Sequence, residues 1–162
     1  MKYGSNVNLL LRNLFFTILQ PGIVAGYVPY LILKNKLVKI PVHLWNFYQY
    51  SGLFIFVIGL IVMFSCIISF AVHGRGTLSP ADPTKRLVIK GLYKFSRNPM
   101  YIGVILILAG EALFFLSSYL LIYLLLIFIA FHIFILLHEE PRMKKVFKDE
   151  YDDYYKKVKR WL

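Results

Sequence analysis

The chain has 162 residues, 59% of them hydrophobic, and a formal net charge of +11. This composition is too apolar for an ordinary soluble domain and predicts a single-domain integral membrane protein. Its basic residues lie beside apolar runs, where they suit anionic lipid headgroups, so nucleic acid is not an expected partner. The single cysteine, Cys66, lies in an apolar run and provides neither a disulfide framework nor a reactive thiol.

Residues 14–33 form the first predicted membrane-spanning helix, because they carry no charge and can cross a hydrocarbon core of about 30 Å. Residues 47–72 form the second predicted span, in which Gly52 and Gly59 are candidates for close helix packing. Aromatic residues near the start of this span mark the membrane interface, namely Trp45, Tyr48 and Tyr50.

The third apolar block, residues 98–137, contains Glu111 as its only formal charge. As one helix it would be about 60 Å long, twice the thickness of the bilayer core. We therefore predict two spans joined by a tight turn at residues 117–119. The expected fold class is an all-α integral membrane protein with four transmembrane helices.

The charged tail, residues 139–162, is predicted to form an amphipathic helix against the membrane or the rest of the domain. Its apolar residues recur at helical spacing and are Met143, Phe147, Tyr151, Tyr154, Val158 and Trp161. Together with the N-terminus, the basic loop at residues 73–98 and the tail contain most of the Lys and Arg residues. This charge bias predicts that both termini and the loop are cytoplasmic.

Two polar motifs bracket the third apolar block. The first reads GLYKFSRNPMYIG, from Gly91 to Gly103, and the second begins with EEP at residues 139–141. The second motif continues along the tail with Phe147, Glu150, Tyr151, Tyr154, Arg160 and Trp161. This order and spacing resembles the signature of the isoprenylcysteine carboxyl methyltransferase and phospholipid methyltransferase family, and the resemblance covers residues 73–162.

Members of this family are integral-membrane enzymes that use S-adenosylmethionine as methyl donor, and the resemblance implies the same activity and cofactor here. The implied acceptor is a membrane-resident molecule, such as a lipid amine, an isoprenylcysteine carboxylate or a similar apolar nucleophile. Residues 1–72 then supply two N-terminal spans, and residues 73–162 form the catalytic region. The positions that match cofactor-contacting positions of the family are Leu87, Val88, Tyr93, Asn98, Pro99, Met100, Tyr101 and one of Glu139 and Glu140.

The residue types in the two motifs suit this cofactor. A carboxylate of Glu139 or Glu140 can bind its ribose hydroxyls or its amino group, and aromatic rings can contact the adenine or the sulfonium. Pro99 starts a helix whose free N–H groups, with Arg97, can bind the cofactor carboxylate. Alternatively, Arg97 and the two glutamates form an ion-pair network that closes the helix hairpin.

Three residues are candidates for catalysis, namely Arg97, Asn98 and Glu111. An acidic residue inside the membrane is a functional candidate, so Glu111 could hold a cationic headgroup or accept a proton from an amine. The alternative is a neutral Glu111 that is hydrogen-bonded to a neighbouring helix. His132 is expected to be packed and hydrogen-bonded, and no metal site is expected, because no two His or Cys residues show ligand spacing.

Three positions depart from the family pattern. Asn98 stands where prenylcysteine-modifying members carry His, and Asn cannot carry a proton at neutral pH. Ile135 stands where those members place an Arg for the substrate carboxylate. These two departures favour lipid amines or other apolar nucleophiles over prenylcysteine. Lys148 replaces a Gly, which leads us to expect a continuous helix at that point.

Two other functions remain open. A membrane oxidoreductase similar to sterol reductases would use NADPH, although such enzymes have larger chains and more spans. A non-catalytic membrane protein could have retained the pocket and would bind the cofactor without turnover.

Overall fold

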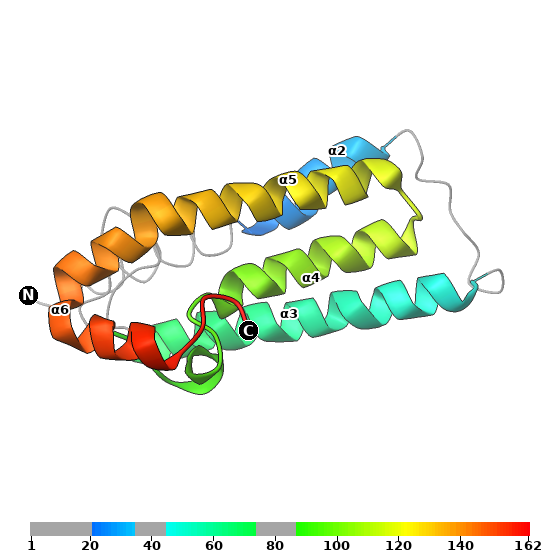
Figure 1. Cartoon of the computed structure of the whole chain (residues 1–162). Helices are drawn as coiled ribbons and strands as arrows, with labels where there is room; N and C mark the ends of the chain where they lie inside the picture. Colours follow the sequence, from blue (N-terminus) through cyan, green and yellow to red (C-terminus); the bar gives the residue numbers. More distant parts are fainter. Residues whose placement is uncertain (1–20, 35–44, 74–86) are drawn as a thin grey trace, which may run out of the picture.

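The computed structural model describes residues 21–34, 45–73 and 87–162, without the side chains of residues 70–73. All regular secondary structure in these ranges is helical, as the predicted all-α class requires. In the labels of Figure 1, where η marks a π- or 3-10 helix, the elements are η1 (Ile23–Tyr27), α2 (Val28–Leu33), α3 (Phe47–His73), η3 (Gly91–Lys94), α4 (Pro99–Phe114), α5 (Ser118–Phe134), η4 (Ile135–Glu139) and α6 (Glu140–Lys157).

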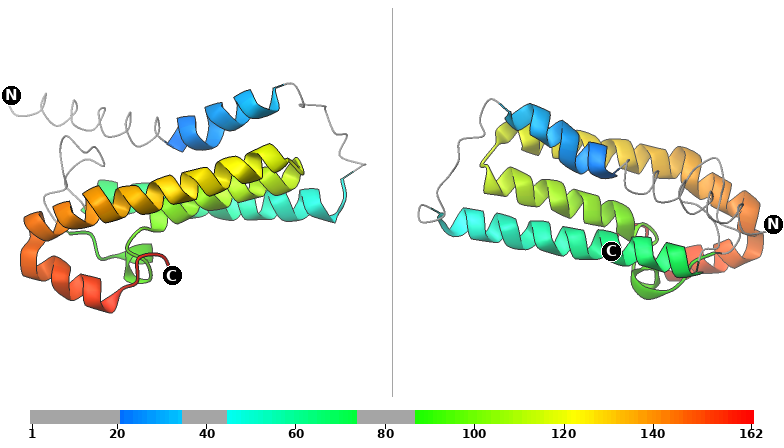
Figure 2. Two further views of the ribbon diagram at one scale, coloured as in Figure 1. Left: turned by 45° about the horizontal axis from the view of Figure 1, so that its top comes forward. Right: turned by 180° about the vertical axis from the view of Figure 1, so that it is seen from behind.

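Helices α2 to α5 lie side by side as a bundle (Figures 1 and 2). The most extensive contact joins α3 to α4, while α5 packs against α4 and α2 against α5. After α5 the chain bends through η4 into α6, which turns back toward the start of α4 (Figure 1). This bend brings the tail to the end of the bundle where the first motif lies.

Glycines allow α3 and α4 to touch backbone to backbone. A Cβ atom on Gly52 would lie 2.6 Å from the Phe114 nitrogen, and one on Gly59 would lie 2.9 Å from the Gly103 oxygen. On α4, a Cβ atom on Gly110 would lie 2.7 Å from the Gly52 oxygen. These contacts confirm the predicted close packing at Gly52 and Gly59, and they show that the two helices run antiparallel.

The predicted turn between two helices is present, but it occupies residues 115–117 and not 117–119. Helix α4 ends at Phe114, and α5 begins at Ser118. Leu116 has a positive φ of 45°, which turns the chain. The Ser117 hydroxyl then caps α5 by accepting a hydrogen bond from the Leu120 N–H at 3.4 Å.

Two helices of the described ranges are long and apolar enough to cross a membrane, Phe47–Ser69 and the helix that starts at Ser118. The four predicted spans are therefore only partly supported. Helix α4 is shorter, at Pro99–Phe114, because Pro99 starts it and the turn before Ser118 ends it. The first predicted span, residues 14–33, lies partly outside the described ranges, and its described part is the short apolar helix Ile23–Leu33.

Helix α6 confirms that the tail is helical, and none of its six predicted apolar residues is exposed. Lys148, however, has φ 45° and ψ −123°, so α6 kinks there and the expectation of continuous helix is wrong. The helix also ends at Lys157, and the backbone is extended at Val158. Residues 158–162, called the C-terminal strap below, leave the helix because their backbone hydrogen-bonds to the first motif.

Candidate active site

The first motif is anchored on the end of α3. Gly91 has a φ of 60°, a conformation that glycine adopts without steric cost, and it opens the one-turn helix η3. From this turn the Tyr93 side chain enters a buried cluster with Cys66 and Val88, and Met100 packs against the cluster. Three predicted cofactor positions therefore share one apolar cluster, while Leu87 is half-buried beside it.

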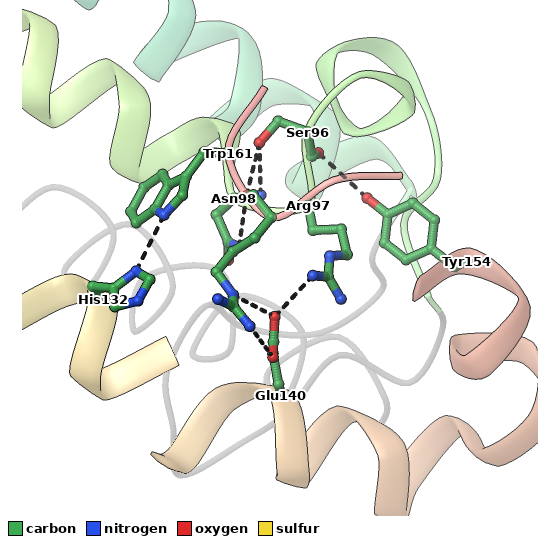
Figure 3. A network of polar contacts seen from close by, with 8 residues as sticks. Ser96, Arg97, Asn98, His132, Glu140, Tyr154 and Trp161 are labelled. Carbon is green, nitrogen blue, oxygen red and sulfur yellow. Dashed lines mark hydrogen bonds and ion pairs between the residues drawn. The ribbon is translucent and has the colours of Figure 1, made fainter. Parts of the chain in front are cut away.

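The C-terminal strap crosses the first motif and hydrogen-bonds to it (Figure 3). The Arg97 N–H donates to the Lys159 carbonyl at 2.9 Å. The Asn98 side-chain amide and the Ser96 hydroxyl both donate to the Arg160 carbonyl, at 3.0 and 3.2 Å. Asn98 therefore uses its donor to hold the strap.

Tyr154 links α6 to the same motif. Its hydroxyl donates to the Tyr93 carbonyl at 2.6 Å, with the Ser96 carbonyl as a longer second acceptor at 3.4 Å. In the sequence, Tyr154 is recognisable only as part of the apolar stripe and the second motif. Ser96 carries no recognisable signal, because no residue pattern marks a serine whose partner lies 64 positions along the chain.

Glu140 is the centre of a buried ion-pair network (Figure 3). Arg160 binds it in bidentate fashion, from Nε to Oε1 and from Nη2 to Oε2, both at 2.9 Å. Arg97 Nη2 reaches Oε1 at 3.1 Å, and the side chains of Arg97 and Glu140 are only 7% and 9% exposed. The network predicted as the alternative is thus present for Arg97 and Glu140, and it joins α4, α6 and the strap.

Glu139 points to a different partner. Its Oε2 accepts a hydrogen bond from the Tyr101 hydroxyl at 2.8 Å, and the Tyr101 ring packs on Phe131 with centroids 4.7 Å apart. Burial raises the pKa of Glu139; the Tyr101 hydrogen bond lowers it in part, and the Glu140 charge raises it further. Burial likewise raises the pKa of Tyr93 well above its ordinary value, so its hydroxyl is neutral.

Arg97 retains hydrogen-bonding capacity after binding Glu140. Its Nε and Nη1 atoms are buried and make no hydrogen bond of good geometry within the described residues, although the Tyr151 hydroxyl lies close enough to interact with the guanidinium. The guanidinium also lies over the Tyr155 ring, with Cζ 3.8 Å from the centroid. Buried donors without good hydrogen bonds are costly, so they suit an anionic ligand group. Glu139 has a partner other than Arg97, but it adjoins Glu140 in sequence, so a carboxylate and buried donors lie at the same end of the bundle and together suit an amino acid.

His132 has the packed, hydrogen-bonded role that was expected. Its Nδ1 accepts a hydrogen bond from the Trp161 indole N–H at 3.3 Å, and the two rings stack with an interplanar angle of 16° (Figure 3). The Trp161 ring also lies 5.2 Å from that of Phe128. These contacts fasten the end of the strap to α5.

Glu111 does not belong to this site. It lies near the opposite end of α4 from Asn98, about 20 Å away along the helix axis at 1.5 Å per residue. The predicted catalytic group of Arg97, Asn98 and Glu111 is therefore not assembled in one place. Pro99 and the rest of the first motif do lie at the site, because they surround the start of α4.

The comparison with protein families agrees with the family that the two motifs indicate. A family model described as phospholipid methyltransferase matches residues 47–150, more than half of the chain. The match starts with α3, covers the whole of the first motif and ends within α6, at residue 150 of the second motif. No curated protein and no solved structure matches the chain. The family resemblance expected from the two motifs is thus confirmed, and the chain belongs to the phospholipid methyltransferase family.

Proposed function

We propose that this protein is an integral-membrane methyltransferase that uses S-adenosylmethionine to methylate a lipid amine. The observation that carries the proposal is the presence of the Glu139 carboxylate and of buried Arg97 donors at the same end of the bundle. Glu139 shares one oxygen with Tyr101, and Arg97 keeps two buried nitrogens that make no hydrogen bond of good geometry in the described part of the chain. The family assignment supports methyl transfer as the reaction.

The role that we propose for each residue follows from its contacts. The Glu139 carboxylate would bind the amino group of the cofactor, and the remaining N–H groups of Arg97 would bind its carboxylate. Charge-assisted hydrogen bonds of this kind contribute roughly 1.5–3 kcal/mol each. Glu140 would not contact the cofactor, because both of its oxygens are bound by arginines.

The chemistry that S-adenosylmethionine supplies when bound is an electrophilic methyl group on a sulfonium. The protein's own contribution is then to hold the acceptor in line and to exclude water, which can lower the barrier by roughly 7–11 kcal/mol. Tyr93 and Asn98 are buried at the site, and the strap covers the backbone of the motif. These residues make the site rigid and dry.

The proposed acceptor class follows from two positions. Ile135 is fully buried at the start of η4, where a prenylcysteine-modifying relative would need a cation for the substrate carboxylate. Asn98 is buried and bound to the strap, and an amide cannot carry a proton. A neutral amine acceptor requires neither group, so these positions favour a lipid amine over an isoprenylcysteine carboxylate.

We propose that α4 lies in the same apolar layer as the two long helices. Its glycines contact α3 within the candidate span Phe47–Ser69, so α4 accompanies that span through the membrane. The site then lies at the face of the bundle where α6 and most basic residues are found, which we assign to the cytoplasm. The cofactor would enter from that side, and the acceptor would enter sideways from the bilayer.

Calorimetric titration of the detergent-purified chain tests the proposal. We expect S-adenosylmethionine to bind, and we expect Glu139→Gln to weaken binding by about 10- to 100-fold, because one charge-assisted hydrogen bond is lost. The control is Glu150→Gln, which removes the same charge from an exposed position of α6. Incorporation of labelled methyl groups from the cofactor into a lipid extract then identifies the acceptor.

Three results would contradict the proposal. The first is binding of NADPH in place of S-adenosylmethionine, which would favour a reductase. The second is unchanged cofactor affinity in Glu139→Gln. The third is tight cofactor binding without any labelled lipid, which would leave a non-catalytic membrane protein.

A further inference from the structure

A hollow lies between α3 and α4 at the end of the bundle that is remote from the two motifs. It has a volume of about 220 Å³. Its lining consists of Gly52, Leu53, Phe56, Gly110, Glu111, Phe114 and Phe115. A cavity needs only about 10–15 Å³ on this measure to hold one water molecule, so this hollow can receive a much larger group. Among its seven lining residues, Glu111 is the one with an ionisable side chain.

One oxygen of the Glu111 carboxyl group, Oε2, is buried and has no donor in the described part of the chain. Tyr123 on α5 is close enough to interact with it electrostatically, but the Tyr123 hydroxyl donates to the Val24 carbonyl at 3.0 Å. A buried oxygen without a donor costs about 1–3 kcal/mol, and more when it is charged. The hollow therefore suits a ligand that brings a donor and a positive charge.

The aromatic residues around the hollow indicate that it lies near the interface between membrane and water. Helix α3 starts at Phe47, and Gly52 and Leu53 lie in its second turn. Trp45, just before this helix, contacts Phe114 edge to face with ring centroids 5.0 Å apart. Trp and Tyr residues gather where a membrane meets water, and Tyr50 is 55% exposed here. A lipid at this interface would present its headgroup to Glu111.

We propose that this hollow binds the primary ammonium headgroup of a phospholipid. An ammonium of this kind has three N–H donors and a positive charge, which match the carboxylate of Glu111. The phenylalanine rings in the lining can add cation–π attraction. Leu53 is 40% exposed at the rim, which leaves an apolar path for the acyl chains.

This lipid is not the substrate of the methyltransferase site. Glu111 lies about 20 Å along α4 from Asn98, so a headgroup bound here is far from the proposed cofactor position. No bond is made or broken in the hollow. The inference requires α3 to cross the membrane, but it does not require methyl transfer, so the two proposals can fail separately.

Trp45 can report on the hollow, because it contacts one of the lining residues. The chain has two tryptophans, so Trp161→Phe leaves Trp45 as the only indole. The experiment titrates this full-length variant in detergent with short-chain phosphatidylethanolamine and follows Trp45 fluorescence. Phosphatidylcholine of the same chain length provides a cation without N–H donors, and phosphatidylglycerol provides an anionic headgroup.

We expect a saturable fluorescence change with the ethanolamine lipid, at least about tenfold weaker binding of the choline lipid and no binding of the glycerol lipid. Glu111→Gln should weaken binding of the ethanolamine lipid about tenfold or more, as expected for the loss of one charge-assisted hydrogen bond. Glu150→Gln should leave it unchanged. A second variant, Leu53→Phe, narrows the hollow from its exposed rim and should also weaken binding.

Equal affinity for the ethanolamine and choline lipids, or unchanged binding in both Glu111→Gln and Leu53→Phe, would overturn the inference. Cofactor calorimetry on Glu111→Gln separates this outcome from a folding defect, because the cofactor site lies at the other end of α4. A variant that binds S-adenosylmethionine like the parent chain but has lost the ethanolamine lipid supports a separate lipid site.

Discussion

Glu139 and Glu140 are adjacent in sequence, yet their side chains serve different partners. Successive residues of a helix point about 100° apart, so two neighbours cannot face the same group. Glu140 faces Arg97 and Arg160, which occupy both of its oxygens, whereas Glu139 faces Tyr101. At the residue scale, only Glu139 is therefore available for a ligand.

The pH dependence of cofactor binding tests this assignment of Glu139. Burial raises its pKa above the ordinary value of 4.5, so the free protein takes up a proton at a higher pH than an exposed carboxyl would. Only the carboxylate form pairs with a cationic amino group. We therefore expect cofactor affinity to fall as the pH is lowered to the raised pKa of Glu139 and below it, because binding must then release the proton.

Calorimetric dissociation constants at several pH values check this expectation. The profile of Glu139→Gln should be flat over the same range, and a parallel decline in that variant would assign the titration to another group. The effect of Glu139 on the free energy of unfolding has the opposite dependence on pH. The raised pKa of Glu139 favours the folded protein at low pH, and this contribution is lost as pH rises through the folded-state pKa.

Lys148 is the second residue with a specific energetic consequence. Its φ of 45° lies in a region where a side chain clashes with the backbone, and such residues cost of order 1–3 kcal/mol. Lys148→Gly should remove this strain, and we expect it to raise the free energy of unfolding by about 1 kcal/mol after the entropic cost of glycine.

Thermal unfolding of the detergent-solubilised variants measures this effect. Lys145→Gly is the matched control, because Lys145 is exposed in the regular part of α6. It should lose about 0.8–1 kcal/mol, the ordinary cost of a glycine inside a helix. Equal destabilisation by both substitutions would show that Lys148 bears no strain.

At the scale of elements, the contact between α3 and α4 determines where the first motif lies. The glycines let the two backbones approach closely, which gives van der Waals contact that lipid chains cannot replace. Helix α4 is thereby held along α3, and the first motif, which precedes it, is placed on the end of α3. A change in the distance or angle between α3 and α4 would therefore move the whole site.

Gly59→Ala tests whether the close contact between α3 and α4 stabilises the bundle. Its new Cβ would lie 2.7 Å from the Ile107 nitrogen and 2.9 Å from the Gly103 oxygen, and these backbone atoms cannot move without separating the helices. We expect a loss of about 1–3 kcal/mol in the free energy of unfolding, as for an overpacked core. Gly26→Ala is the control, since nothing lies within 4 Å of a Cβ there. If both variants unfold at the same temperature, the close approach does not stabilise the bundle.

At the scale of the whole molecule, the chain end returns to the first motif and closes the site. Arg160 and Trp161 belong to the strap, and they contact Glu140 at the start of α6 and His132 on α5. Arg97 adds the start of α4 to the same network. The site thus depends on the first motif, α5, α6 and the strap.

Glu140→Gln should strongly weaken the contact between the strap and the rest of the site. It leaves two arginines without their carboxylate, and Arg97 is only 7% exposed. Removing one partner of a buried ion pair costs about 3–5 kcal/mol, so we expect a loss of that size in the free energy of unfolding. Chemical denaturation measures it, with Glu150→Gln as the exposed control. A loss below about 1 kcal/mol would mean that the network behaves like a surface ion pair.

The sequence alone predicted the features that depend on local pattern. Composition predicted the membrane class, the length of the third apolar block predicted a turn between two helices, and glycines predicted the close packing of α3. The two motifs identified the family and the end of the bundle where the site lies. Each of these properties follows from neighbouring residues or from spacing within one segment.

The tertiary structure decided which of these residues act together. Sequence could not separate Glu139 from Glu140, because their difference lies in partners that come from distant segments. It grouped Glu111 with Arg97, although a helix places the two near opposite ends, and it missed Ser96, whose partner is the returning chain end. Spacing within a segment is written in the sequence, whereas contacts between segments arise only when the helices pack and the tail folds back.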